Sequence, residues 1–199
     1  MTISLAIDTS TSRTSAAIIE DGGILWHGYR DGATSHGSAL PALVSEGLAV
    51  QKQIDHVVVG MGPGPYTGLR VGVAFARSFA LARGIDVIGV CSLDAIASLV
   101  REENDFIIAT DARRKEVYWA TYRAGVRVDA PHVDHPDVIA KMGLPIFGEG
   151  ALKYSIASSD EDLFPDPKSL VALSKNTDLH IKEPLYLRRP DAVPTQERA

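Results

Sequence analysis

Two aspartates stand where a magnesium-dependent phosphate site needs carboxylates. Asp8 and Asp111 each come directly after an apolar stretch, and carboxylates are ligands that Mg²⁺ accepts together with substrate phosphates. However, Asp8 is followed by Thr9 and Ser10, and neither aspartate is followed by the glycines that let a backbone approach a phosphate closely. The pattern therefore favours hairpins whose own side chains satisfy the turn. Asp8, Thr9, Ser10 and Asp111 are predicted to form only a vestigial nucleotide site.

A glycine-proline segment separates an apolar stretch from a long apolar helix. Residues 57–59 are β-branched, as in a strand covered on both faces, and the glycines and prolines that follow cannot extend it. Such a loop before a helix N-terminus can hold a phosphate. Pro63 and Pro65 each lack an N–H donor and no P-loop lysine follows, so a rigid turn with Thr67 as the N-cap is the better interpretation. The residues assigned to the turn are Gly62, Pro63, Gly64, Thr67 and Gly68.

The other candidates for metal or nucleophilic chemistry have unsuitable spacing. His36 begins a predicted helix, and a metal-binding helix would need a second ligand one turn later, where Leu40 stands. The histidines and aspartates at 132–137 match no defined metal site. Cys91, the single cysteine, follows an apolar strand and is expected to be a small buried residue. We therefore expect no metal, no cofactor and no catalytic residue.

The order of apolar and helical patterns predicts an α/β fold. Three antiparallel strands followed by alternating helices and strands are typical of the ribonuclease-H-like core of the actin-like ATPase (ASKHA) fold. That fold consists of duplicated lobes, and the strand pattern indeed restarts before Asp111. Strands are expected at 2–8, 14–20, 23–30, 57–59, 86–90, 106–110 and 116–123, and helices at 38–52, 68–83 and 93–103.

These patterns predict two lobes of unequal size. The first, at 1–103, is expected to hold a mixed five-stranded sheet, and the second, at 104–190, is a reduced lobe. Residues 129–136 and 158–168 are predicted to be loops, and 191–199 to be a disordered tail.

The helix at 68–83 carries apolar residues on every side. Gly68, Gly72, Ala76 and Ala80 form a stripe of small residues that permits another element to approach closely. A helix without a polar face needs two burial surfaces. We expect one to be the sheet of the chain itself and the other to be a partner or second domain.

Composition and charge exclude some classes of function. The 199 residues are 45% apolar and 23% charged, which is ordinary for a globular protein. A net charge of −5 argues against a protein that binds nucleic acid without a partner protein. The basic residues at 113–115 and 188–189 remain possible contacts. No apolar run approaches membrane-spanning length, and no basic leader precedes residue 7. We expect a cytoplasmic protein with no membrane contact.

Several of these segments together resemble the bacterial TsaB (YeaZ) family over nearly the whole chain. The glycine-proline loop is specific to this family, with Pro65 and Tyr66 where serine and phenylalanine are commoner. The segments that carry the resemblance are 8–10, His36, 62–70, 92–94, 111–118 and 184–188.

The resemblance implies a non-catalytic scaffold or activating subunit. In that family TsaB pairs with its catalytic relative TsaD, and the complex threonylcarbamoylates the adenosine beside the anticodon of tRNAs that read codons beginning with A. TsaD holds a metal through a His-x-x-x-His helix, and Leu40 stands at the position of its second histidine. TsaE, an ATPase, joins the pair, isolated TsaB is expected to form a homodimer, and tRNA contact is expected to be at most indirect.

The same resemblance implies that the partner is bound by helices of the first lobe. Helical periodicity alone does not distinguish the side chains that face the core from those that face the partner. The residues assigned to partner binding are His36, Leu40, Leu43, Val44, Leu69, Arg70, Val73 and Arg77.

Two other functions compete with this interpretation. A small actin-type phosphotransferase, similar to a sugar or acetate kinase, would bind Mg-ATP at Asp8 and Asp111. A peptidase is the third candidate, and neither a metal pair nor a nucleophile-base pair supports it.

Overall fold

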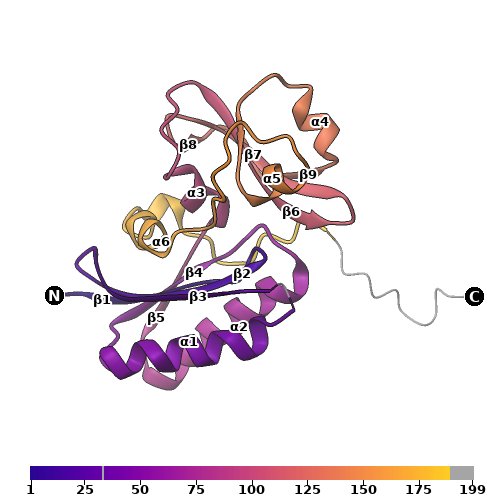
Figure 1. Ribbon diagram of the computed structural model, residues 1–199. Helices are drawn as coiled ribbons and strands as arrows, with labels where there is room; N and C mark the ends of the chain where they lie inside the picture. Colours follow the sequence, from indigo (N-terminus) through magenta and orange to yellow (C-terminus); the bar gives the residue numbers. More distant parts are fainter. Residues whose placement is uncertain (33, 189–199) are drawn as a thin grey trace, which may run out of the picture.

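The computed structural model describes residues 1–32 and 34–188, which form two α/β lobes. Figure 1 shows the first lobe below the second. The predicted tail at 191–199 lies outside the described residues.

The first lobe is built on a mixed five-stranded sheet in the order β3-β2-β1-β4-β5. The first three strands pair antiparallel, and β4 and β5 run parallel to β1, as the strand order along the chain predicted. β4 is completely buried after its first residue, which agrees with its run of valines. The strands are β1 (Ile3–Asp8), β2 (Arg13–Glu20), β3 (Gly23–Asp31), β4 (His56–Gly60) and β5 (Asp86–Val90).

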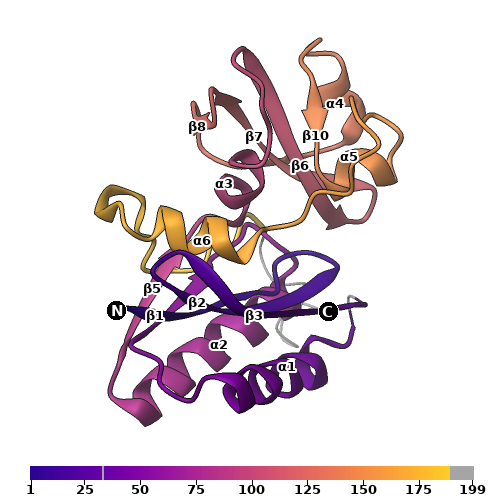
Figure 2. The ribbon, with the colours of Figure 1, turned by 60° about the vertical axis from the view of Figure 1, so that its left-hand side comes forward.

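Helices cover both faces of this sheet. α1 (His36–Val50) and α2 (Tyr66–Arg83) lie on one face, and α6 (Pro167–Leu173) lies on the other, toward the second lobe (Figures 1 and 2). The core under α1 and α2 is the larger one, and it includes Leu5, Ile7, Leu40, Leu43 and Leu69.

The second lobe has a smaller sheet in the order β10-β6-β7-β8, with β9 also paired to β7. Its long hairpin of β6 and β7 corresponds to the two strands predicted around Asp111. The strands are β6 (Asp105–Arg113), β7 (Glu116–Arg123), β8 (Val126–Arg127), β9 (His132–Asp134) and β10 (Ile146–Phe147). The helices are α3 (Ser92–Ala97), α4 (Pro136–Ala140) and α5 (Glu149–Lys153), and a 3₁₀ turn spans Thr177–Leu179.

The two lobes exchange elements. Leu93 and Ile96 of α3, from the first half of the chain, pack with Phe106 and Tyr122 in the core of the second lobe. Conversely, Leu170 of α6 packs against the first sheet. The last described segment then returns to the first lobe, where the Leu185 N–H donates to the Met61 carbonyl at 2.8 Å. The boundary expected near 103 thus separates the strands of the lobes but not their cores.

Three local predictions were wrong. The helix predicted at 93–103 ends at Ala97, and 3₁₀-type bonds to the carbonyls of Ile96 and Ala97 close it. Residues 132–134 form β9, because they pair with distant residues of β7 that local sequence cannot reveal. α2 begins at Tyr66, so Thr67 lies inside the helix and Pro65 occupies the cap position.

Candidate functional site

Asp8 is enclosed by hydrogen-bond donors from the protein itself. Its Oδ1 accepts from the backbone N–H and the hydroxyl of Ser10, both at 2.8 Å, and its Oδ2 accepts from the Ser92 hydroxyl at 2.6 Å. Only 1% of Asp8 is exposed, and burial raises its pKa although these hydrogen bonds oppose the shift. A Cβ on Gly60 would lie 1.8 Å from Asp8 Oδ2, so the backbone also closes over the carboxylate. Asp8 therefore acts as a structural acceptor here.

Thr9 joins the first hairpin to α2. Its hydroxyl donates to the Gly68 carbonyl at 2.7 Å and accepts from the Gly72 N–H at 3.1 Å. Because these two backbone groups are four residues apart, they would bond each other in a regular helix. The Thr9 hydroxyl thus bridges one step of the α2 hydrogen-bond ladder. A Cβ on Gly72 would lie 2.3 Å from this hydroxyl, so the small residues at this end of α2 serve contact within the chain.

Asp111 is satisfied by a different set of partners. Oδ2 pairs with the Lys153 ammonium at 2.6 Å and the Arg113 guanidinium at 3.2 Å. Oδ1 accepts from the Tyr154 hydroxyl and the Arg113 N–H, both at 3.0 Å. Both strand-end aspartates are therefore engaged by protein groups.

Glu149 connects the two hairpins. Its Oε1 accepts from the Asp111 N–H at 3.1 Å, and its Oε2 accepts from the Ser12 hydroxyl at 3.2 Å. Burial raises the pKa of this carboxyl. The turns that begin at Asp8 and Asp111 therefore face each other across one shared side chain, which no local motif in the sequence indicated.

The glycine-proline turn is packed tightly against the first hairpin. Gly62 has a positive φ of 81°, and a Cβ on Gly64 would lie 2.4 Å from the Ser10 carbonyl oxygen. The Gly62 carbonyl accepts from the Ser92 N–H at 2.8 Å. Gly62, Pro63, Gly64 and Gly68 are buried, whereas Thr67 is exposed. These contacts set the direction in which α2 leaves the sheet.

His36 has a structural partner and no neighbouring metal ligand. Its Nδ1 lies 2.8 Å from the Thr14 hydroxyl, and burial, reinforced by the charge of Arg113, lowers its pKa. Leu40, one turn later, is a core residue. Within 1–32 and 34–188, no group of three or more His, Cys, Asp or Glu side chains is placed to hold a metal.

Most of the residues assigned to partner binding lie in the core. Leu40, Leu43, Val44, Leu69 and Val73 are at most 4% exposed, because they face the first sheet. Of the remaining three, His36 is buried, while Arg70 and Arg77 are exposed. The five apolar side chains therefore do not contribute to the surface of the chain, and this assignment is corrected: any partner surface on these helices consists of other residues.

The outer face of α2 presents those other residues. It is defined here by Thr67, Val71, Ala74, Ser78 and Ala82, which are small or apolar and uncharged. Val71 is half-buried and the other four are exposed. Leu81, beside this face, is 84% exposed. Sequence periodicity missed this face, because the large side chains on the opposite side of α2 gave the stronger signal.

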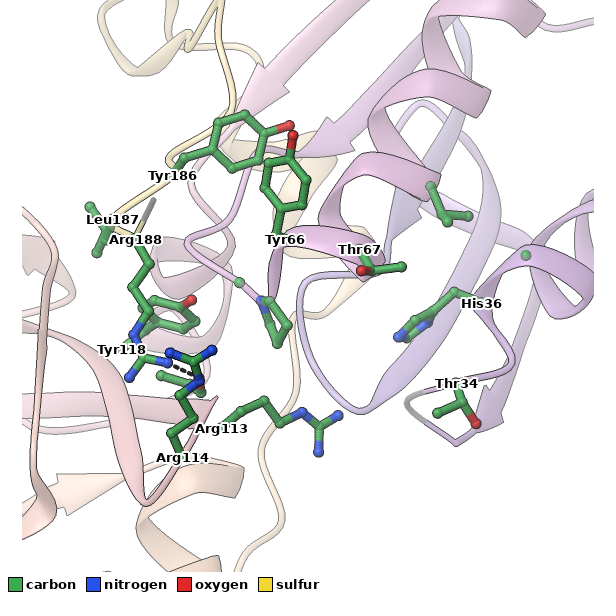
Figure 3. A pocket seen from close by; sticks show the side chains of 16 residues that line it. Thr34, His36, Tyr66, Thr67, Arg113, Arg114, Tyr118, Tyr186, Leu187 and Arg188 are labelled. Atoms are coloured by element: carbon green, nitrogen blue, oxygen red, sulfur yellow. Dashed lines mark hydrogen bonds between the residues drawn. The ribbon is translucent and has the colours of Figure 1, made fainter. Parts of the chain in front are cut away.

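An inter-lobe cavity of about 680 Å³ lies next to the start of α2. One wall comes from the first lobe and includes His36 and Tyr66, and the opposite wall comes from the β6–β7 turn (Figure 3). The rings of Tyr66 and Tyr186 lie 5.0 Å apart at its edge. Arg188 donates to the Ala112 carbonyl at 3.0 Å and pairs with Glu116, both in the second lobe. Because Leu185 bonds to Met61 of the first lobe, residues 185–188 bridge the two lobes. Of the residues that the sequence analysis singled out, His36, Gly64, Thr67, Gly68, Arg113, Arg114 and Arg188 line this cavity.

The described part of the chain offers no candidate for a membrane span, since none of its helices combines the length and the apolar character that crossing requires.

Comparisons with known proteins agree with this architecture. Residues 31–187 match the family model of TsaD, tRNA N6-adenosine threonylcarbamoyltransferase. A Mycobacterium leprae protein described as uncharacterized is 43% identical over 98% of this chain, which spans 57% of that protein. The tRNA threonylcarbamoyladenosine biosynthesis protein TsaB of Escherichia coli is 28% identical, over 92% of this chain and 94% of its own length.

A solved structure extends the similarity to three dimensions. YeaZ from Pseudomonas aeruginosa superposes with a TM-score of 0.72 at 25% identity, covering 88% of this chain and 91% of that one. The match to the family model covers more than half of the chain. The chain therefore belongs to the TsaB (YeaZ) family, within the wider group that the TsaD model describes.

Proposed function

We propose that this chain is a non-catalytic subunit in tRNA threonylcarbamoyladenosine biosynthesis and that it acts by pairing with a TsaD-type protein. The observation that carries the proposal is the occupation of both strand-end carboxylates by protein donors, in a chain of the TsaB family. Asp8 is held by Ser10 and Ser92, and Asp111 by Lys153, Arg113 and Tyr154. A catalytic phosphate site would need these oxygens for a metal ion.

The partner surface that we propose is the outer face of α2 together with the adjoining part of α1. Small side chains such as Ala74 and Ser78 allow a helix of a partner to approach closely, and half-buried Phe75 and Phe79 beside them supply apolar area. Their rings stack at 6.1 Å. Arg70 and Arg77 border this face and provide charged groups for its rim.

The rest of the proposed assembly follows from the family. TsaE joins the heterodimer, and this chain contacts tRNA at most indirectly, because its net charge is −5. In isolation the chain uses the same face for a homodimer, since an uncovered apolar face favours burial. The complex works in the cytoplasm.

The alternative, a small actin-type phosphotransferase, requires Mg-ATP at Asp8 and Asp111. No observation favours it, because neither carboxylate presents a free oxygen to the inter-lobe cavity in the arrangement described above.

The experiment uses the full chain and the TsaD-type protein of the same organism. Ala74→Arg places a charge in the middle of the proposed face. It is expected to lower the affinity for the TsaD-type protein about a hundredfold, so that the two proteins no longer co-elute, and to abolish tRNA modification. Ala140→Arg, at an exposed position of α4 in the second lobe, is the matched control and should leave both unchanged. Full modification by TsaD and TsaE without this chain, or normal pairing of Ala74→Arg, would show that the proposal is wrong.

A further inference from the structure

A serine, a histidine and an aspartate lie side by side on neighbouring strands of the first sheet. β1 and β4 run parallel with Ser4 opposite His56, and β4 and β5 run parallel with His56 opposite Asp86. The Ser4 Oγ lies 3.0 Å from the His56 Nε2, which is a hydrogen-bonding distance. The three residues come from distant parts of the sequence, so only the register of the parallel strands brings them together.

This row lies on the α6 side of the sheet. Successive side chains of a strand point to opposite faces, so Ser4 faces the same side as Ala6, and His56 the same side as Val58. Ala6 and Val58 pack in one cluster with Leu170 of α6. The row is therefore separated by the sheet from α1 and α2.

A second cavity, of about 340 Å³, adjoins the row. Ser4 and His56 both line it, together with apolar Ile88 and Val171 and the side chain of Lys175. Ser4 is only 2% exposed, so a molecule reaches its hydroxyl through this cavity. The volume is within the range of small-molecule sites.

The surroundings of His56 suit a general base. Burial lowers the pKa of His56, and the negative charges of Asp55 and Asp86 oppose this shift without reversing it. The ring is therefore neutral at neutral pH, and in the tautomer with its proton on Nδ1 the Nε2 can accept the proton of the Ser4 hydroxyl. Once that proton has moved, the two carboxylates stabilise the imidazolium.

We propose that Ser4 and His56 form a nucleophile–base pair that hydrolyses esters of small carboxylic acids. The Ser4 Oγ attacks the carbonyl carbon while His56 Nε2 takes the hydroxyl proton, and this proton passes to the alkoxide as its C–O bond breaks. Lys175 supplies positive charge to the cavity for the oxyanion. Water then attacks the acyl-serine, and its proton returns through His56 to the Ser4 Oγ as the acid leaves. Each turnover consumes one ester and one water and releases one acid and one alcohol.

This reaction is separate from tRNA modification, in which we propose a non-catalytic role for the chain. It takes place on the α6 side of the sheet and needs neither the outer face of α2 nor a partner protein. Either proposal can therefore fail without the other.

The test uses the full chain alone, with p-nitrophenyl acetate as the substrate and a fluorophosphonate as the covalent probe. We expect turnover of the ester and one phosphonyl group on Ser4, located by mass spectrometry of the tryptic peptide that ends at Arg13. Ser4→Ala and His56→Gln should each lower the hydrolysis rate by about a hundredfold and abolish labelling.

Two matched variants control for unspecific acylation. Ser15→Ala removes another buried serine on the α6 side of the sheet, two residues before Ala17 of the same cluster. His27→Gln removes an exposed histidine of β3. Both should hydrolyse the ester and be labelled as the wild type is.

Ser4→Cys tests the same pair in a variant that keeps the size of the side chain. Burial raises the pKa of Cys91 to about 12, so the native cysteine should not react. Iodoacetamide should alkylate Ser4→Cys about tenfold faster than the double variant Ser4→Cys/His56→Gln, because His56 takes the proton of the thiol.

Three outcomes would overturn the proposal. These are no labelling of Ser4 in the wild type, unchanged hydrolysis in Ser4→Ala or His56→Gln, and equal alkylation of Ser4→Cys with and without His56.

Discussion

The two hairpins of the molecule begin alike and are stabilised differently. β1 ends in Asp8 and β6 continues past Asp111, and each aspartate precedes a turn into an antiparallel strand. Both carboxylates are buried, but Asp8 accepts only from neutral donors, whereas Asp111 also pairs with two cations whose side chains are 43% and 46% exposed. The comparison shows two ways in which a carboxylate can become structural: enclosure by neutral donors or pairing with cations that reach solvent.

The largest expected effect distinguishes these two ways of stabilising a carboxylate. Asp8→Ala leaves the donors of Ser10 and Ser92 buried without an acceptor and should lower the free energy of unfolding by about 2–4 kcal/mol. Asp111→Ala leaves Lys153 and Arg113 able to reach water, because their side chains are 46% and 43% exposed, and should therefore cost less than Asp8→Ala. Urea unfolding of both variants measures the difference, and equal losses would contradict the distinction.

The next effect concerns the close approach of α2 to the first hairpin. Gly72→Ala places a Cβ against the Thr9 hydroxyl that bridges the α2 ladder, and the overpacking should cost about 1–3 kcal/mol. Gly37→Ala is the matched control, because a Cβ there meets nothing within 4 Å in α1. Thermal unfolding should rank Gly72→Ala below the wild type and Gly37→Ala at or above it.

The third effect is the pH dependence that Asp8 contributes. Its pKa in the folded protein is raised above 3.8, so in the interval between the two values the folded state binds more protons than the unfolded state. Stability from this group is therefore complete below the unfolded pKa and is lost as the pH rises through the folded pKa. The hydrogen bonds from Ser10 and Ser92 oppose the shift that burial causes.

Asp8→Asn isolates this contribution, because it removes the titration at one position. The stability of the wild type relative to Asp8→Asn should decrease as the pH rises from 4 to 7 in urea unfolding. A difference that is constant across this range, or that grows with pH, would show that Asp8 does not titrate as described.

Much of the fold was predictable because it depends on local patterns. The valines of β4, the apolar run of β6 and the alternation of β7 indicated strands, and their order indicated the mixed sheet. What local patterns could not show are pairings between distant segments. β9 exists only because it pairs with β7, and α3 ends early although residues such as Leu99 continue an apolar pattern.

The candidate site was less predictable for the same reason. The sequence indicated Asp8 and Asp111 as carboxylates that follow apolar stretches, but it contained no sign of Glu149, which joins their turns through contacts 137 and 38 residues apart. On α2, periodicity could not separate Leu69 and Val73, which face the sheet, from Ala74 and Ser78, which face outward. That distinction depends on where the sheet lies relative to the helix.

The exchange of elements between the lobes has a consequence for synthesis on the ribosome. A nascent chain that has emerged only to residue 103 contains the first sheet, α1 and α2, but it lacks α6 and the second-lobe partners of α3. Ala6, Ala17 and Val58 on the α6 side of the sheet then remain uncovered until Leu170 and Val171 have been translated. The first lobe therefore cannot complete its core as an independent N-terminal unit, and both lobes reach their final packing together, late in translation.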